Sequence, residues 1–254
     1  LEIALERAGF RGVLDAAAKA AGVAPSALRV VIKPDLSGFD RGSPIATDPA
    51  LVEHFIDWLH GRGFTCVSVG HAVDSADRWL GNRDALALAD LLGYAFVTTE
   101  GRPYDVVDLS EDTIPADFPP GSALSGTSLS RAWLDAHVRV SFAKNRTDED
   151  ATYALCLQNL LTVLPLRDKH YHYRARRDPA DVCIELLRRT PVHLCVIDAI
   201  VSNHGSFGGS VASPIATDTI IAGTDPVLTD WAGAAKMNVD PHRSPVMAKA
   251  LAAL

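Results

Sequence analysis

The sequence predicts a layered α/β protein, with a mostly parallel sheet, helices on both faces and room for a smaller second lobe. Two observations carry this prediction: short β-branched runs alternate with longer amphipathic segments, and several of those segments begin at an Asp-Pro step. The chain has 254 residues, of which 48% are hydrophobic and 22% charged. This ordinary composition suits one large domain, so we treat residues 1–254 as a single α/β domain.

The first strand–helix–strand unit sets the direction of the sheet. "RVVIKPDL" (29–36) and "FTCVSVG" (64–70) are apolar, β-branched runs that predict buried strands. Between them, "TDPALVEHFIDWLHGRG" (47–63) predicts a helix, because Asp48 is a good N-cap residue and Pro49 suits the first helical position. Two strands joined by one helix are typically parallel, with a right-handed crossover.

The remaining elements follow from the same patterns of spacing and helix caps. We expect further helices at 4–21, 83–92, 147–164, 178–190 and 224–237. We expect further strands at 94–99, 104–109, 138–144, 192–200 and 219–223. The Pro- and Gly-rich stretch 112–126 predicts a loop.

Charge and hydropathy limit the classes of partner. The formal net charge is −7, so the chain lacks the basic footprint that nucleic-acid binding needs, and we expect no nucleic-acid partner. The dense basic run of Arg174, Arg176 and Arg177 suffices for one small anion. No apolar run approaches 18 residues and no signal peptide is evident, so we expect no membrane partner and a cytoplasmic location.

The four cysteines predict reduced thiols rather than a metal or cluster site. Cys66, Cys156, Cys183 and Cys195 form no Cys-x-x-Cys pair, and three of them lie in apolar segments. Zinc and iron–sulfur sites usually draw on closer pairs. We therefore expect no bound iron–sulfur cluster.

Polar residues gather where the predicted strands end. In open α/β sheets, ligands bind beyond the carboxyl ends of the strands. The residues at these ends are Lys33, Asp35, His71, Lys144, Asp198, His204, Thr224 and Asp225. We expect most of them to converge on one crevice that binds a small polar anion.

Lys33 and Lys144 are candidate catalytic residues, because each follows a β-branched run. A lysine shielded at a strand end can hold a carboxylate or phosphate, and acts as a base where desolvation lowers its pKa. The structural alternative is that each lysine pairs with a nearby aspartate, Asp35 or Asp148.

The stretch "KHYHYRARR" (169–177) supplies two more candidates, His170 and His172. If the stretch is extended, both imidazoles lie on one face and suit a divalent transition metal, with Asp198 as a third ligand. The alternatives are general acid–base chemistry or contact with substrate, together with Arg174, or a polar loop between two helices.

Asp198 ends the most apolar strand and precedes the glycine loop "NHGSFGG" (203–209). A carboxylate there can orient His204, ligate a cation, or cap the loop. The loop can cradle a phosphate or carboxylate with its backbone N–H groups, or can be a flexible turn. Its candidate substrate-binding residues are His204, Gly205, Gly208 and Gly209.

An ordered series of segments resembles domain-of-unknown-function family 362. The segments are "VVIKPDL", "ATDPALVEHFIDWLHGRGFTCVSVG", "VSFAKN", "QNLLTVLP", "KH", "CVIDAIVSNHGSFGGS" and "IIAGTDPVLTDWAGAAKM", between about residues 29 and 241. The resemblance implies an α/β fold and a site that includes Asn159, from the family's Lys-Asn-Leu helix. A weaker fold-level similarity is to lactate-racemase-like nickel-pincer enzymes, with His71 as the corresponding histidine.

The sequence departs from the family pattern at three places. Lys144, Asn145 and Arg146 stand where many members have Lys-x-His, and Gln158 replaces the usual lysine. The ferredoxin-type cysteine cluster of many members is missing, which puts an electron-transfer role in doubt.

These observations together favour a small-molecule enzyme with isomerase- or lyase-type acid–base chemistry on a carboxylate or phosphate substrate, with or without a metal. The alternatives are a non-catalytic binding or accessory module, and a redox protein that works with an external iron–sulfur or flavin partner. The protein is also a candidate homo-oligomer.

Overall fold

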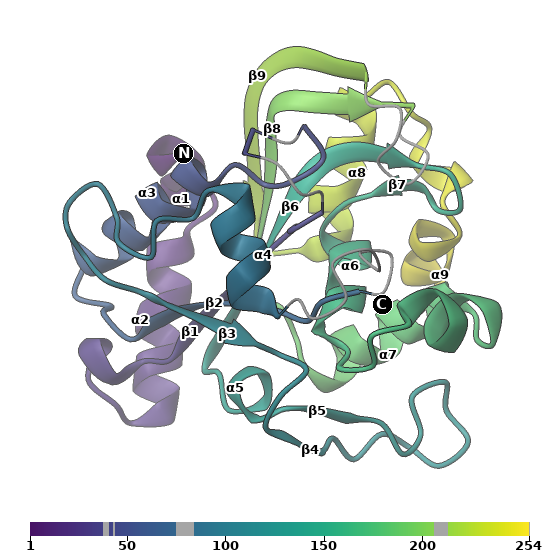
Figure 1. Ribbon diagram of the computed structural model, residues 1–254, viewed down its shortest axis with the longest axis horizontal. Coiled ribbons are helices and arrows are strands. Elements are labelled where there is room, and N and C mark those ends of the chain that lie inside the picture. Colours follow the sequence, from purple (N-terminus) through teal and green to yellow (C-terminus); the bar gives the residue numbers. More distant parts are fainter. Residues whose placement is uncertain (38–40, 43, 75–83, 206–212, 254) are drawn as a thin grey trace.

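The computed structural model describes residues 1–37, 41–42, 44–74, 84–205 and 213–253. The central sheet has the strand order β3-β2-β1-β6-β8-β9, and β7 pairs with β6 (Figure 1). Strands β3, β2, β1, β6 and β8 run parallel, whereas β9 and β7 are antiparallel to their neighbours. The predicted layered α/β fold with a mostly parallel sheet is therefore confirmed.

The strands are β1 (Val30–Pro34), β2 (Val67–His71), β3 (Asp105–Asp108), β6 (Val138–Asp148), β7 (Thr152–Ala154), β8 (Leu194–His204) and β9 (Ser213–Gly223), with a separate hairpin of β4 (Thr113–Pro115) and β5 (Ser128–Ser130). The α-helices are α1 (Glu2–Arg7), α2 (Phe10–Ala21), α3 (Pro49–His60), α4 (Ala85–Leu92), α5 (Arg131–Leu134), α6 (Cys156–Asn159), α7 (Pro179–Arg189), α8 (Pro226–Lys236) and α9 (Pro245–Ala253). Short 3-10 turns lie at Pro25–Ala27, Leu160–Val163 and Pro241–Arg243, and a π-helix spans His170–Ala175.

The helices form two layers, one on each face of the sheet (Figure 1). Apolar side chains of α1 to α4 pack with Val30, Ile32 and Phe142 on one face. Side chains of α6 to α9 pack with Val31 and Ala143 on the other. We call these the first and second helical layers. Successive residues of a strand face opposite layers, so two residues of one strand meet the same layer only if they are an even number of positions apart.

Three helices begin at the predicted Asp-Pro steps. The Asp48 carboxylate accepts the N–H of Ala50 at the start of α3. Asp178 and Asp225 accept N–H groups in the same way at the starts of α7 and α8. Each side chain satisfies a backbone donor that the first helical turn leaves without a partner.

Several element predictions were wrong for identifiable reasons. Residues 4–21 form two helices because Gly9 adopts a left-handed conformation (φ 68°) between them. Residues 94–99 are not a strand; only an isolated bridge joins Val97 to Pro103. The predicted loop 112–126 contains strand β4.

The largest error is the helix predicted at 147–164. There β6 continues to Asp148, turns back through Thr152 (φ 71°) into β7, and only then enters α6. Arg146 pairs with Ala154 and Asp148 with Thr152 across this hairpin. Ladder hydrogen bonds with β7 and β8 therefore override the helical spacing of the apolar residues.

A buried carboxylate fixes the start of α6. Asp230 of α8 accepts the backbone N–H groups of Cys156 (2.8 Å) and Leu157 (2.9 Å). Burial raises the pKa of Asp230 to about 7, although these two N–H groups oppose the rise. The contact holds α6 against α8, and α6 carries Asn159.

We predict that Asp230→Ala lowers the free energy of unfolding by about 3 kcal/mol, because two buried N–H groups lose their acceptor. Urea denaturation measures the loss, and Asp15→Ala, at an exposed position of α2, is the matched control. A loss no larger than that of the control would contradict this role.

Candidate functional site

The candidate site lies at the carboxyl edge of the parallel strands, where the order of strands changes direction. The chain runs from β1 through β2 to β3 on one side of β1, and through β6 to β8 on the other. The ends of β1 and β6 therefore border the topological switch point at which open α/β sheets place their ligands.

Lys33 is the central residue of this edge. Its side chain is fully buried, and its Nζ donates to Pro34 O (2.7 Å) and to Asn159 Oδ1 (2.5 Å). The pKa of Lys33 is lowered to about 7, mainly by burial and also by the charges of Lys169 and Arg146, against the opposing charge of Asp35. A neutral amine satisfies these two acceptors with its two N–H groups and keeps a lone pair.

Asn159 holds Lys33 at two points. Its Oδ1 accepts from the Lys33 amine, and its Nδ2 donates to Lys33 O (3.0 Å) and to Ser141 Oγ (3.1 Å). Ser141 in turn donates to Cys156 O (3.0 Å). The amide of Asn159 thus contacts the protein on both sides, and its predicted contact with substrate stays a prediction.

His71 and Lys169 complete the cluster around Lys33. His71 ends β2, is buried, and its Nδ1 has no hydrogen-bond partner. Burial holds the pKa of His71 well below its usual range, and the charges of Lys33 and Lys169 add to this. Lys169 is also buried, and its Nζ donates to Val73 O (3.0 Å) and Leu166 O (3.1 Å).

An ion pair closes the switch point beside this cluster. Arg146 of β6 contacts Asp35, which follows β1, with Nε 3.0 Å from Oδ2. Burial favours the neutral form of Asp35, but the charges of Arg146 and Lys33 prevail and lower its pKa below the usual value. The predicted residues Lys33, Asp35, His71 and Asn159 are therefore brought together.

Lys144 and Asp198 lie on the other face of the sheet, which corrects the predicted single crevice. Lys144 and Asp198 are register partners, and Lys144 Nζ lies 2.8 Å from Asp198 Oδ2. The same oxygen accepts the N–H of Asp48, next to the start of α3 in the first helical layer. Lys33 pairs in register with Ser141, and Lys144 is three positions, an odd number, further along the same strand. Lys33 and Lys144 therefore face opposite layers.

The segment around His170 and His172 is helical rather than extended. Residues two apart on a helix do not face each other, so the two imidazoles do not share a face. His172 packs edge-on against Tyr171, and the side chain of His170 is exposed. Only Lys169, at the start of the predicted segment, reaches Lys33.

The three predicted metal ligands are not brought together. His170 and His172 face different directions, and Asp198 is held by Lys144 on the opposite face of the sheet. Within the described ranges, no three His, Cys, Asp or Glu side chains are grouped to hold a metal ion. The geometry thus gives the metal prediction no ligand set.

The described start of the glycine loop lies beside the end of β6, where Asn203 is the register partner of Arg146 and Gly205 N–H donates to Thr147 Oγ1 (2.8 Å). β8 continues from Asp198 to His204, which is about 20 Å of strand, so His204 and Gly205 are remote from Asp198. Gly208 and Gly209 lie outside the described residues. Thr224 and Asp225 follow β9, whose antiparallel direction places them at the opposite edge of the sheet.

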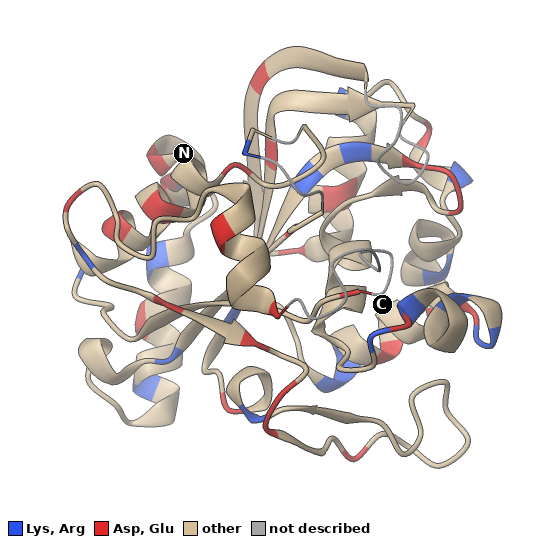
Figure 2. Cartoon of the chain, in the orientation of Figure 1, with Lys and Arg blue, Asp and Glu red and all other residues tan. Residues whose placement is uncertain are grey.

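Arg174 also has contacts that the sequence did not predict. Its guanidinium lies 2.9 Å from Asp150 and 4.0 Å from Asp148. Figure 2 shows basic and acidic residues interspersed along this part of the chain. Arg174 borders a small cavity of its own rather than the Lys33 cluster.

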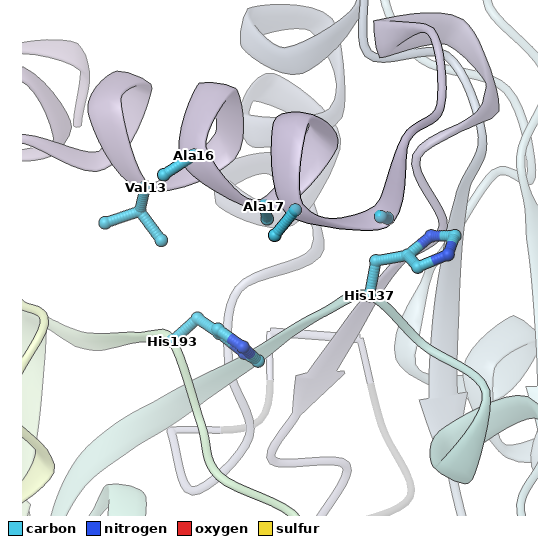
Figure 3. A pocket seen from close by; sticks show the side chains of 7 residues that line it. Val13, Ala16, Ala17, His137 and His193 are labelled. Carbon is cyan, nitrogen blue, oxygen red and sulfur yellow. The ribbon is translucent and has the colours of Figure 1, made fainter.

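A cavity of about 530 Å³ at the amino edge of the sheet contains two histidines with structural roles (Figure 3). His137 Nδ1 accepts the N–H of Arg29 (2.9 Å), and His193 Nδ1 accepts the N–H of Arg139 (3.1 Å). Each ring therefore caps a backbone donor where a strand begins. The remaining lining is an apolar face of α2, formed by Val13, Ala16, Ala17, Ala20 and Ala21.

Sequence reasoning missed Lys169, Arg146 and Ser141 as parts of the site. Arg146 lies two residues beyond the end of the predicted strand 138–144, and the true strand continues past it. Lys169 stood out only as a neighbour of a basic run. Nothing local marks Ser141, because its role depends on the register of β6 with β1.

A family model for "Domain of unknown function (DUF362)" matches residues 30–235, which is most of the chain. The chain belongs to the DUF362 family. The match confirms the resemblance predicted for residues 29 to 241. Among curated proteins, none matches this sequence. The fold-level similarity of this DUF362 protein to nickel-pincer enzymes stays a prediction.

We predict that the buried amine of Lys33 makes stability rise with pH. The pKa of Lys33 is about 7 when folded and near 10.5 when unfolded, so between these values the unfolded chain binds the extra proton. The destabilisation that burial of this amine causes is therefore greatest below pH 7, decreases as the pH rises and vanishes above pH 10.5. In this pH window, the free energy of unfolding of the wild type should rise by up to about 1.4 kcal/mol per pH unit more than that of Lys33→Met.

Urea denaturation at pH 7, 8, 9 and 10 measures this difference in slope. Lys19→Met, an exposed lysine of α2, is the matched control and should keep the slope of the wild type. Equal slopes for the wild type and Lys33→Met would contradict a lowered pKa.

We predict that Lys144→Met destabilises the protein by about 3 kcal/mol, because Asp198 keeps a buried charge without its partner. Thermal and urea denaturation test this expectation. Replacing both residues, as Lys144→Met with Asp198→Asn, should recover part of the loss. A single variant as stable as the wild type would show that the pair is not structural.

Proposed function

We propose that this DUF362 protein is an enzyme that binds a small polar anion, a carboxylate or phosphate, and moves a proton at the carbon next to a carbonyl group. The observation that carries this proposal is the Lys33 amine, buried at the switch point with two neutral acceptors and a pKa of about 7. A base whose pKa lies near the working pH is largely unprotonated and yet basic enough to remove a proton from the substrate.

The residues around Lys33 have separate roles in this proposal. Neutral Lys33 removes a proton from the substrate carbon, becomes an ammonium and returns the proton to the product, so the step needs no oxidant. Lys169 and Arg146 supply positive charge for the enolate that forms. His71 is neutral and hydrogen-bonds the Pro34 backbone, so its unused Nδ1 can accept a hydrogen bond from a substrate hydroxyl group. Asn159 orients the amine and is a positioning residue.

Two parts of the sequence-based hypothesis change in this proposal. Lys144 is replaced by Lys169 as the second lysine, since Lys144 is committed to Asp198. The metal-assisted version is left aside because its three ligands lie apart. As part of the same proposal we place the protein in the cytoplasm, where its free cysteines stay reduced. Within the described ranges, no helix is both long and apolar enough to cross a membrane.

Hydrogen–deuterium exchange tests the proposal without knowledge of the natural substrate. The protein is incubated in D₂O with 2-oxobutyrate or dihydroxyacetone phosphate, and loss of the proton next to the carbonyl is followed by NMR. We expect exchange on the order of 10²-fold above buffer for at least one probe, rising with pH through about 7 as Lys33 becomes neutral. Lys33→Met should abolish the exchange, whereas Lys19→Met should preserve it.

A second variant separates catalysis from folding. Asn159→Asp places a carboxylate beside the Lys33 amine, so the midpoint of the pH profile should move upward. An unmoved midpoint, or exchange by Lys33→Met at the wild-type rate, would contradict Lys33 as the base. Stabilisation by either probe without any exchange would favour the alternative of a non-catalytic binding module.

A further inference from the structure

A second, smaller cavity lies outside the Lys33 cluster, in the second helical layer. Its volume is about 190 Å³, below the range of drug-sized ligand pockets. It lies between the end of α6, the π-helix and the starts of α7 and α9. Its lining residues are Asp150, Ala151, Gln158, His170, Arg174, Ala175, Pro179, Pro245 and Val246.

Most of the cavity wall is apolar. Ala151, Ala175, Pro179, Pro245 and Val246 contribute only methyl, methylene and isopropyl groups. Burying an apolar group of a ligand here gains about 25 cal/mol per Å² of apolar surface removed from water. The cavity therefore suits a compact apolar body rather than a sugar or a nucleotide.

One end of the cavity carries a fixed pair of opposite charges. Arg174 lies 2.9 Å from the Asp150 carboxylate, which stands at the exposed rim. The second guanidinium nitrogen donates to the Gln158 side-chain oxygen (2.9 Å), and the Gln158 amide nitrogen donates to Tyr153 O (3.0 Å). Gln158 is buried, so the guanidinium is held in place before any ligand arrives.

Arg174 and Asp150 both keep hydrogen-bonding capacity beyond the contact that they make with each other. A guanidinium has five N–H donors, of which Asp150 and Gln158 take two, and a carboxylate accepts several hydrogen bonds. A ligand with one negative and one positive group can therefore contact both residues without adding net charge. A dianion such as phosphate would instead meet the charge of Asp150 at close range.

We propose that this cavity binds a small apolar α-amino acid as the free zwitterion. The ligand carboxylate lies against Arg174, its ammonium against Asp150, and its aliphatic side chain against Pro179, Pro245 and Val246. The proposal does not rest on the proton-transfer function, because none of these residues contacts Lys33.

Binding of L-leucine and L-valine tests this site by isothermal titration calorimetry. Two analogues each remove one charge: 4-methylpentanoate lacks the ammonium and isopentylamine lacks the carboxylate. We expect at least one amino acid to bind, and each analogue to bind at least about tenfold more weakly. An analogue that binds as tightly as the amino acid would overturn the zwitterion assignment, as would the failure of both amino acids to bind.

Variants then locate the site and its polarity. Arg174→Gln and Ala175→Phe should weaken amino-acid binding at least about tenfold, whereas Arg176→Gln, which removes an exposed charge outside the cavity, should not. Asp150→Asn should weaken the binding of L-leucine, which loses the partner of its ammonium group. It should strengthen the binding of 4-methylpentanoate, because the carboxylate that repels this anion is removed. Unchanged affinity in Arg174→Gln and Ala175→Phe, with their melting temperatures intact, would show that binding occurs elsewhere.

The two proposals fail independently. Lys33→Met should bind the amino acids with wild-type affinity, even though it should lose hydrogen exchange. If Lys33→Met lost amino-acid binding while remaining folded, the cavity would belong to the Lys33 site and the separate site would be wrong.

Discussion

The contact between Lys33 and Asn159 is the constraint on which the candidate site depends. It ties the end of β1 to α6, which Asp230 holds from α8. The buried amine is tolerated because burial lowers its pKa to about 7, so that it can be neutral, and two neutral acceptors take its N–H groups. A structural lysine would be expected to meet a carboxylate, as Lys144 meets Asp198. The two buried lysines thus differ: Lys33 has a lowered pKa and neutral partners, whereas Lys144 forms an ion pair with Asp198.

Alternating charges link the switch point to the π-helix. Asp35 contacts Arg146, Arg146 lies 3.6 Å from Asp148, and Arg174 contacts Asp150 and approaches Asp148. The chain of contacts follows the extension of β6 beyond the rest of the parallel sheet. It gives this edge a fixed polar framework, although its carboxylates and guanidiniums largely neutralise one another.

Much of the fold, and half of the site, could be predicted from the sequence. Apolar runs and Asp-Pro caps sufficed for β1, α3, β2, α7 and α8, and the family segments pointed to Lys33 and Asn159. The division between the two faces could not be predicted, because it depends on the register Lys33–Ser141. A shift of one residue would have placed Lys144 on the same face of the sheet as Lys33. The helical state of His170 and His172 was equally hidden, since a short polar stretch has no hydrophobic period.

The pKa of Lys33 is the most direct test of this account. Lysine labelled with ¹³C at the ε-carbon can be titrated by NMR in the intact protein, with Lys33→Met used to assign the signal. The account predicts a midpoint near 7 for Lys33. A midpoint above 10, as for a lysine in water, would show that the amine stays charged at neutral pH and would contradict its role as a base.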